Sequence, residues 1–345
     1  MSRPFRFALF GAGFWAQYQL AAWHELENVE CAAIYNRTLS KAQALAERMC
    51  VERVYDDPQT LLEHESLDAV DIVTAVEAHA PLTRLAAQHG LPVICQKPLA
   101  ATLAEAESMV VACEQASVPL LAHENWRWQR PIRALQARLL TGRIGRPFRA
   151  HLQYSNSFPV FETQPFLKTL AHFILSDMGS HILDVARFLF GEAESLYCQT
   201  DRVHPDIQGE DVATVMMRMG DAGTTVTCEL SYASRWERER FPELFMLIEG
   251  ERGSLELAPN YWVRETTAEG TWSQRYPPIR YPWASVEHTL VHASIVDCQR
   301  NLLSALRNEG TAETTGRDNL ETVRLVHAAY ASADRGMALN PREPF

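Results

Sequence analysis

The sequence predicts a doubly wound α/β domain followed by an α+β domain with a large, mostly antiparallel sheet. From Phe5 to Pro119, short apolar segments of β type alternate with longer segments of helical periodicity, which is the pattern of βαβ units around a parallel sheet. After His123, several segments alternate apolar and polar residues without long helices between them, which favours antiparallel strands. We therefore expect two domains, residues 1–124 and 125–345.

The expected elements follow the chain in this order. The first domain has a helix from Thr38 to Met49, which is rich in Ala, Leu, Glu and Lys, and the second has a final helix ending at Gly336, a suitable C-cap. In the first domain, strands are expected at 5–11, 29–36, 69–75, 91–96 and 118–124; in the second, the segments that alternate in the β manner are 149–157, 213–219, 223–234, 244–257 and 261–266. Further helices are expected at 131–141, 174–190, 288–307 and 318–334.

Composition narrows the class of partner. The 345 residues carry 32 Lys and Arg against 43 Asp and Glu, a net charge of -11, which disfavours nucleic acid and anionic membrane surfaces. No apolar run approaches the roughly 18 residues of a membrane span. The seven cysteines are scattered and form no C-x-x-C pair, so we expect neither disulfides nor a bound metal, and a cytoplasmic location.

A glycine-rich turn follows the first expected strand. It reads Gly11-Ala12-Gly13-Phe14-Trp15-Ala16, a G-x-G-x-x-A pattern that opens a helix. Gly11 permits the tight turn, Gly13 lets the backbone approach a pyrophosphate, and Ala16 lets helix and strand pack closely. The pattern predicts a Rossmann dinucleotide site, although a glycine turn of an α/β protein that binds no nucleotide can have the same sequence.

The end of the second strand bears on the choice between NAD and NADP. An acid that binds the ribose is expected there, but the sequence reads Tyr35-Asn36-Arg37-Thr38. Nothing in it repels a 2′-phosphate, and Arg37 can pair with one. NADP is therefore favoured over NAD, unless Arg37 is only a solvated surface charge.

Three polar side chains further along have the chemistry of a hydride-transfer site. Asp177 and His181 are four residues apart in an expected helix and share a face, which Asp184 joins. Histidine exchanges protons near neutral pH, and the ammonium of Lys97 can stabilise a developing alkoxide. Each feature also has an ordinary structural interpretation, as a local hydrogen bond or a surface turn.

Taken together, five segments resemble the glucose-fructose oxidoreductase and inositol dehydrogenase (Gfo/Idh/MocA) family. They are GAGFWA, LDAVDIVTAVEAH, VICQKPLA, SDMGSHILDVARFLFG and LVHAAYASADRGMAL, and they keep the family's motif order through nearly the whole chain. The resemblance implies an NAD(P)-dependent oxidoreductase of sugars, cyclitols or related polyols. It also implies a Rossmann domain coupled to a domain whose open sheet often forms a dimer interface, so we expect a homodimer or homotetramer.

Residue roles carry over by position in these motifs. Lys97 matches the lysine of the family's E-K-P motif, with a cis bond to the following proline, and Asp177 and His181 match its D-x-x-x-H motif. Thr74 and His79 match the threonine-rich turn and the histidine beside the nicotinamide ribose. The expected cofactor contacts are Gly11, Ala12, Gly13, Phe14, Trp15, Asn36, Arg37, Thr74, His79, Gln96 and Lys97.

The sequence departs from the family at two places. Gln96 replaces the glutamate before the lysine, so that a neutral amide stands where a carboxylate is usual. Residues 170–175 read LAHFIL in place of a glycine-rich approach to the D-x-x-x-H helix, which leaves the size of the substrate pocket open.

The segment HENWRWQ, at the expected domain boundary, offers amide, guanidinium and aromatic groups that suit a polyol. We expect Asn125 and Arg127 to bind substrate with Asp177 and His181, although the tryptophans can equally serve packing. Lys168 and His172 are further candidates for the substrate pocket, although each can equally be a surface residue. With CQKP, this segment is similar to a branch of the family that includes dehydrogenases of aldoses such as apiose.

The expected activity is hydride transfer between NAD(P) and a hydroxyl carbon of a sugar, cyclitol or polyol. His181 is expected to act as general base, Asp177 to orient it or to bind a neighbouring hydroxyl, and Lys97 to stabilise the alkoxide. Two alternatives remain at this point: a redox-neutral glycoside hydrolase or lyase that retains NAD, and a non-catalytic dinucleotide sensor.

Overall fold

The computed structural model describes residues 3–345. Its internal contacts divide the chain into two compact units. Unit 1 comprises the residues up to Asn125 together with 281–284 and 295–323, and unit 2 comprises 126–280, 285–294 and 324–345. Within residues 3–345, no helix has both the length and the apolar character that crossing a membrane requires.

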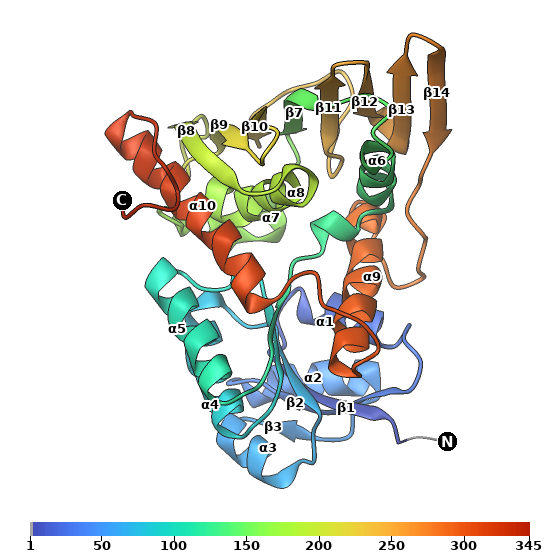
Figure 1. The fold of residues 1–345 in the computed structure, drawn as a ribbon. Helices are drawn as coiled ribbons and strands as arrows, with labels where there is room; N and C mark the ends of the chain where they lie inside the picture. Colours follow the sequence, from blue (N-terminus) through green and yellow to red (C-terminus); the bar gives the residue numbers. More distant parts are fainter. Residues whose placement is uncertain (1–2) are drawn as a thin grey trace. The chain divides into compact units, whose positions relative to one another are not determined.

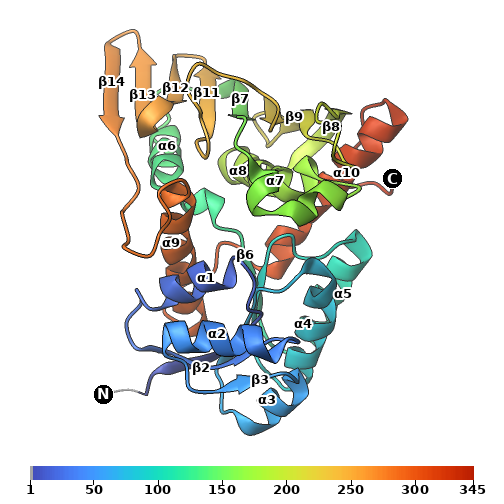
Figure 2. The ribbon, with the colours of Figure 1, turned by 180° about the vertical axis from the view of Figure 1, so that it is seen from behind.

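Unit 1 is a parallel sheet of six strands in the order β3-β2-β1-β4-β5-β6, as the alternation of apolar and helical segments predicts. Helices α1 and α2 lie on one side of the strands and α4 and α5 on the other (Figures 1 and 2). Its elements are β1 (Phe5–Phe10), α1 (Ala16–Trp23), β2 (Val29–Tyr35), α2 (Leu39–Met49), β3 (Val54–Tyr55), α3 (Pro58–His64), β4 (Ala69–Ile72), η1 (Val76–Ala78), α4 (His79–Gln88), β5 (Val93–Gln96), α5 (Leu103–Gln115) and β6 (Leu120–His123).

The core of unit 1 follows from the two-residue period of its strands. Ala8 and Phe10 of β1 pack with Val70 and Ile72 of β4 in the same apolar cluster as residues of α4 and α5. The opposite face of the sheet meets α1, where the rings of Phe7 and Trp23 lie 4.8 Å apart.

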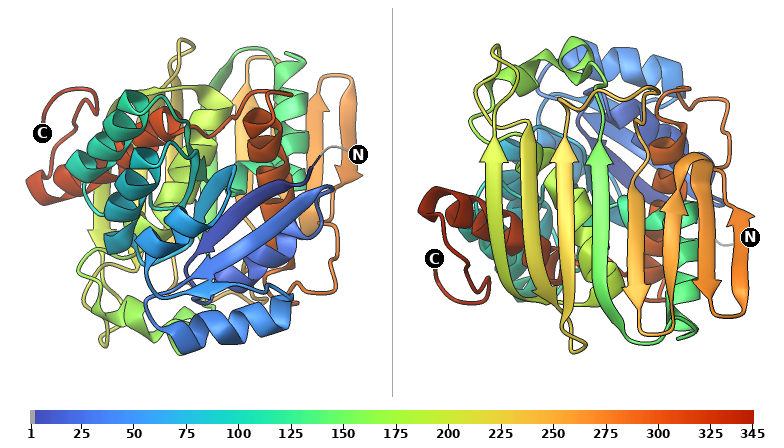
Figure 3. Two further views of the ribbon diagram at one scale, coloured as in Figure 1. Left: turned by 90° about the horizontal axis from the view of Figure 1, so that it is seen from below. Right: turned by 90° about the horizontal axis from the view of Figure 1, so that it is seen from above.

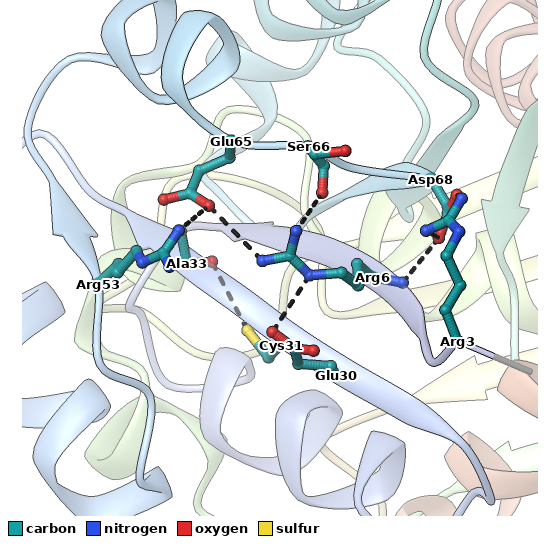
Figure 4. A network of polar contacts seen from close by, with 9 residues as sticks. All are labelled: Arg3, Arg6, Glu30, Cys31, Ala33, Arg53, Glu65, Ser66 and Asp68. Atoms are coloured by element: carbon teal, nitrogen blue, oxygen red, sulfur yellow. Dashed lines mark hydrogen bonds and ion pairs between the residues drawn. The ribbon is translucent and has the colours of Figure 1, made fainter. Parts of the chain in front are cut away.

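The amino ends of β1 and β4 are joined by ion pairs and hydrogen bonds (Figure 4). Arg6 donates from its backbone to Asp68 at 2.9 Å and from its side chain to the carbonyl of Ser66 at 2.7 Å. The carboxylate of Glu65, 1% exposed, pairs with Arg53 at 2.6 Å and with Arg6 at 3.8 Å. This network fixes the loop that leads from α3 into β4.

Unit 2 contains an eight-stranded sheet in the order β14-β13-β12-β11-β7-β10-β9-β8. All its pairings are antiparallel except the parallel one between β7 and β10. Its elements are η2 (Trp126–Trp128), α6 (Arg130–Leu140), β7 (Pro147–Ser155), α7 (Val160–Thr163), η3 (Pro165–Thr169), η4 (Leu175–Gly179), α8 (Ser180–Phe190), β8 (Ala193–Asp201), β9 (Val212–Met219), β10 (Thr224–Ser231), β11 (Phe245–Gly250), β12 (Gly253–Ala258), η5 (Pro259–Tyr261), β13 (Trp262–Thr267) and β14 (Gly270–Arg275).

One face of this sheet is covered and the other is not. Helices α6 and α8 lie behind the strands in the right panel of Figure 3, and within the described residues 3–345 no helix lies in front of them. Along β7, Ala150, Leu152 and Tyr154 are buried, whereas Arg149, His151 and Gln153 are at least partly exposed. The remaining helices, α9 (Thr289–Leu306) and α10 (Gly316–Arg335), each contribute residues to both units.

The expected helix at 174–190 differs from the structure in its first turn. Leu175–Gly179 forms a π-helical turn, η4, and the α-helix α8 begins only at Ser180. A π turn inserts an extra residue into the helix and is often found at functional sites. The 3.6-residue period therefore does not describe the spacing from Asp177 to His181.

Candidate functional site

The glycine turn of unit 1 requires glycine at its first position. Gly11 has a φ of +117°, and a Cβ there would lie 2.3 Å from the carbonyl oxygen of Val73. Gly13 is exposed and has open space around it, so the backbone is accessible where a pyrophosphate would approach. Ala16, by contrast, is fully buried at the start of α1. The structure thus gives each small residue of the motif the surroundings that the motif predicts.

Asn36 connects the end of β2 to the glycine turn by a hydrogen bond. Its Oδ1 accepts a hydrogen bond from the backbone of Ala12 at 3.1 Å, and its Nδ2 donates to the carbonyl of Thr38 at 2.9 Å. Arg37 beside it is exposed. Phe14, also exposed, packs edge-on against Trp15 on the other arm of the turn.

His79 links the turns that follow β4 and β5. Its Nε2 lies 3.2 Å from the carbonyl oxygen of Thr74, and its Nδ1 lies 3.1 Å from that of Pro98. Burial lowers the pKa of His79, although the carbonyl contacts act in the opposite direction. The ring is therefore a buried connector between two turns, and the Lys97–Pro98 bond that it supports is cis, as the resemblance implies.

Lys97 follows β5 in this second turn and is partly buried. Its backbone N–H donates to Oε1 of Gln96 at 2.9 Å. The turns after β1, β2, β4 and β5 all stand at the carboxyl ends of parallel strands, where the strand order reverses between β1 and β4. Ligands bind at such switch points in open α/β sheets, and the exposed backbone at Gly13, which has open space around it, fits the pyrophosphate of a dinucleotide.

In unit 2, η2 holds helix α8 through two neighbouring side chains. The ring of Trp126 stacks on that of His181, with centroids 5.0 Å apart. Arg127 donates to both carboxylate oxygens of Asp184, from Nε at 2.8 Å and from Nη2 at 2.5 Å. Both members of this ion pair are buried. The guanidinium of Arg127 therefore has a partner in α8, which fixes the position of His181 one turn away.

The π turn that carries Asp177 is anchored at its start by Glu210. This carboxylate accepts hydrogen bonds from the backbone of Phe173 and Leu175 and from the hydroxyl of Tyr330 at 2.7 Å. The hydroxyl of Tyr330 in turn accepts from the backbone of Ser176 at 3.1 Å. Asp177 is held between this anchor and α8.

The other residues that the sequence suggested for the substrate pocket lie outside the contacts described so far. Asn125 is buried at the end of unit 1, and Lys168 is exposed in η3. His172 stacks on Tyr330 with centroids 4.1 Å apart.

Three residues of this region escape prediction from the sequence. Tyr154 lies against Trp126, with centroids 5.4 Å apart, and its hydroxyl lies 3.4 Å from that of Tyr232. Burial raises the pKa of both tyrosines, and the charge of Asp177 raises them further. Both hydroxyls therefore stay protonated near Asp177. The only sequence signal for Tyr154 and Tyr232 is an inward position in an alternating segment, expected at 149–157 and 223–234; Glu210 has none.

Two family models match the chain. One, described as an oxidoreductase family with an NAD-binding Rossmann fold, matches residues 5–123. The other, the GFO/IDH/MocA C-terminal domain, matches residues 132–256. Together they span most of both units.

Two named relatives match nearly the full length of the chain. The chain is 42% identical to a D-apiose dehydrogenase of Paraburkholderia graminis, over 97% of this chain and 89% of that protein. It is 38% identical to a D-apiose dehydrogenase of Rhizobium rhizogenes, over 96% of each chain.

Solved structures give the same result. An oxidoreductase from Agrobacterium radiobacter, in complex with NAD+, L-tartaric acid and magnesium, superimposes with a TM-score of 0.95 at 38% identity, over 98% of both chains. A levoglucosan dehydrogenase in complex with NADH and levoglucosan, at 18% identity, has a TM-score of 0.86 and covers 99% of this chain and 100% of its own, which shows the shared fold. The chain belongs to the Gfo/Idh/MocA family of oxidoreductases and is an NAD(P)-dependent dehydrogenase that acts on CH–OH groups.

Proposed function

We propose that the substrate is D-apiose or an aldose of closely similar shape, oxidised at a hydroxyl carbon. The observation that carries this proposal is the 42% identity to a D-apiose dehydrogenase over 97% of the chain. A second D-apiose dehydrogenase at 38% identity supports it. These two relatives favour the dehydrogenase over the redox-neutral and sensor alternatives.

The dinucleotide would be held by the turns at the carboxyl edge of the parallel sheet. Gly11, Ala12 and Gly13 offer backbone to the pyrophosphate, Asn36 and Arg37 adjoin the adenosine ribose, and Thr74, His79 and Gln96 line the nicotinamide end. Phe14, Trp15 and Lys97 complete the set. When bound, the nicotinamide accepts or donates the hydride.

The protein's own groups handle the proton and the charge. We assign His181 as the base that removes the hydroxyl proton, because a stacked and oriented imidazole can exchange protons near neutral pH. Asp177 orients that base or binds a neighbouring hydroxyl. The ammonium of Lys97 donates a hydrogen bond to the oxygen that develops alkoxide character, which lowers the barrier electrostatically.

Substrate recognition is assigned to the amide of Asn125, the ammonium of Lys168, and Asp177 and His181. Arg127 is likewise assigned to substrate binding. Because it also pairs with Asp184, it holds helix α8 in position. The protonated hydroxyls of Tyr154 and Tyr232, close to Asp177, are suited to orient the same carboxylate.

For the cofactor we propose a preference for NADP over NAD that depends on Arg37. The support is the exposed guanidinium next to Asn36 and the lack of an acid at the end of β2. The ratio of kcat/KM for NADP to that for NAD should fall on the order of tenfold in an Arg37→Ala variant. An unchanged ratio would make Arg37 a surface charge.

We propose that the chain forms a homodimer, or a homotetramer that contains this dimer, through the open face of the eight-stranded sheet. Met216 and Leu247 are 48% and 42% exposed and stand in one row across β9, β10, β7 and β11 together with Thr227 and His151. A double variant, Met216→Arg with Leu247→Arg, should sediment as a monomer if this face is the interface.

A cytoplasmic location is proposed from the seven cysteines, none of which is paired in a disulfide.

The activity is tested by initial rates at 340 nm with D-apiose, other aldoses, inositols and sugar acids, each with NAD and with NADP. Reduction of the cofactor with D-apiose at a kcat/KM well above that of the other sugars is the expected result. Reduction only with a cyclitol or a sugar acid would overturn the substrate proposal.

The assignment of Lys97 is tested in the same assay. A Lys97→Ala variant should lose about two to four orders of magnitude in kcat while its dissociation constant for the cofactor stays within about threefold. Equal losses in turnover and cofactor binding would show that Lys97 serves the nucleotide site rather than the chemistry.

A further inference from the structure

A chain of side-chain hydrogen bonds connects a buried carboxylate to the peptide of Lys97. Asp71, in the middle of β4, accepts from Nε2 of Gln19 and from Nε1 of Trp23, both at 2.7 Å. Oε1 of Gln19 accepts from Nε2 of Gln96 at 2.8 Å. Oε1 of Gln96 accepts from the backbone N–H of Lys97 at 2.9 Å. We call Asp71, Gln19 and Gln96 the amide relay.

The relay lies inside unit 1, between the sheet and helix α1. Asp71 and Gln19 are both fully buried, and Trp23 is 1% exposed. Burial raises the pKa of Asp71 to about 6, although the two donors act to lower it. The carboxylate is thus ionised at neutral pH in a place where its charge is costly.

The direction of every hydrogen bond in the relay follows from the charge of Asp71. An ionised carboxylate only accepts, so Gln19 must turn its NH2 toward Asp71 and its oxygen toward Gln96. Gln96 must then present its NH2 to Gln19, which leaves its oxygen for the N–H of Lys97. Each carboxamide has one donor end and one acceptor end, so the orientation of Gln19 determines that of Gln96.

His123 is compatible with this polarity. Its Nδ1 lies 3.3 Å from Nε2 of Gln96, which places it to accept the second hydrogen of that amide. On the far side of the turn, His79 contacts the carbonyl oxygen of Pro98. The turn that contains Lys97 is therefore held at its N–H by the relay and at its carbonyl by a histidine.

We propose that Asp71 is a positioning residue for Lys97, which it orients through Gln19 and Gln96 without touching substrate or cofactor. The proposal rests on the proposed function in that Lys97 is taken to act on the reacting oxygen. It also contains a rule: the relay needs a carboxylate at one end only, at position 71 or at position 96.

The rule follows from what each substitution does to the amides. In Asp71→Asn, the oxygen of the new amide faces the N–H of Trp23, so its NH2 faces Gln19. The carboxamide of Gln19 must then turn around, so that its oxygen faces residue 71 and its NH2 faces Gln96. Gln96 then meets a donor from Gln19 and a donor from the peptide of Lys97 and can accept only one of them. Adding Gln96→Glu supplies two acceptor oxygens, one for Gln19 and one for Lys97, while His123 accommodates the change by carrying its proton on Nδ1.

The experiment compares the native enzyme with Asp71→Asn, Gln96→Glu and the double variant. For each we would measure kcat and KM for the sugar, the dissociation constant for NADPH, the melting temperature, and amide hydrogen exchange of the peptide containing Lys97. Asp68→Asn is the matched control, because Asp68 stands three residues before Asp71 and pairs with Arg3 at the other end of the strand.

Each single variant should lower kcat on the order of tenfold, a loss typical of a misplaced catalytic group, and should speed exchange at Lys97. Asp71→Asn, which changes no residue that contacts the cofactor, should keep KM and cofactor affinity within about twofold. The double variant should recover most of the loss in both kcat and exchange protection, and Asp68→Asn should change neither. A double variant no better than Asp71→Asn would overturn the relay. Restored exchange protection without restored kcat would instead keep the relay and reject the catalytic assignment of Lys97.

Discussion

The buried charge of Asp71 makes a quantitative prediction about stability and pH. Its pKa is raised from 3.8 to about 6 by burial. Between these two values the folded chain binds the proton and the unfolded chain does not, so the folded state is favoured at low pH and loses this advantage as the pH rises through 6. At about 1.4 kcal/mol per pKa unit, the ionised group costs the folded protein roughly 3 kcal/mol at neutral pH.

Asp71→Asn removes this titration and keeps the shape of the side chain. We would measure the free energy of unfolding by urea denaturation for the native protein and the variant from pH 4.5 to 7.5. From pH 4.5 to 7.5, the free energy of unfolding of the native protein should fall by about 2 kcal/mol relative to that of Asp71→Asn. The fall is smaller than the full cost because part of that cost is already present at pH 4.5. The thiols of Cys31 and Cys95, which interact electrostatically with Asp71, have pKa values raised by burial and stay neutral throughout.

Asp57→Asn provides the control. Asp57 caps helix α3, and hydrogen bonds from Thr60 lower its pKa below 3.8, so its contribution is complete at pH 4.5 and the difference from the native protein should stay level. A level difference for Asp71→Asn as well would refute the argument, since it would mean that Asp71 does not carry a costly charge inside the fold.

Three further predictions concern the scaffold of the two units. Gly11→Ala should destabilise the protein by roughly 2–4 kcal/mol in urea denaturation, because the methyl group would collide with a carbonyl and the positive φ is strained. Asp184→Ala should cost about 3–5 kcal/mol by the same measurement, whereas Arg127→Met combined with Asp184→Leu should cost much less, since no buried charge is left alone; equal losses would argue against this reasoning. Burial acts to raise the pKa of Glu65, but hydrogen bonds from Arg53 and Tyr55 outweigh it and the pKa is lowered. Glu65→Gln should therefore destabilise the protein at pH 7, and the difference should shrink as the pH falls below about 4.5; a difference that persists at pH 3 would exclude the ion pair as its cause.

Much of the architecture could be predicted because it depends on local pattern. The parallel sheet follows from the alternation of apolar and helical segments, and the dinucleotide turn follows from Gly11 and Gly13, whose surroundings in the structure match their expected uses. The cis bond before Pro98 follows from the family resemblance.

The supporting contacts of the site could not be predicted, because their partners are far apart in the sequence. Asp71 lies in the apolar strand Ala69–Ile72 and has no local sign of the polar side chains that meet it from α1. The anchor of Glu210 on the segment before Asp177 depends on a loop that carries no motif. The π turn at Leu175–Gly179 is likewise a tertiary effect, because the sequence there has ordinary helical periodicity.

The parallel pairing of β7 with β10 has a consequence for how unit 2 folds. Helix α8 and strands β8 and β9 lie between these two strands in the chain, so the centre of the sheet closes only after that whole segment has been synthesised. Neighbouring pairs such as β11 with β12 and β13 with β14 are local and can form early, whereas non-local pairing is slow because the loop must close first. A nascent chain that has emerged only as far as β9 would therefore hold His181 and Asp177 without the strand that completes the sheet beneath them.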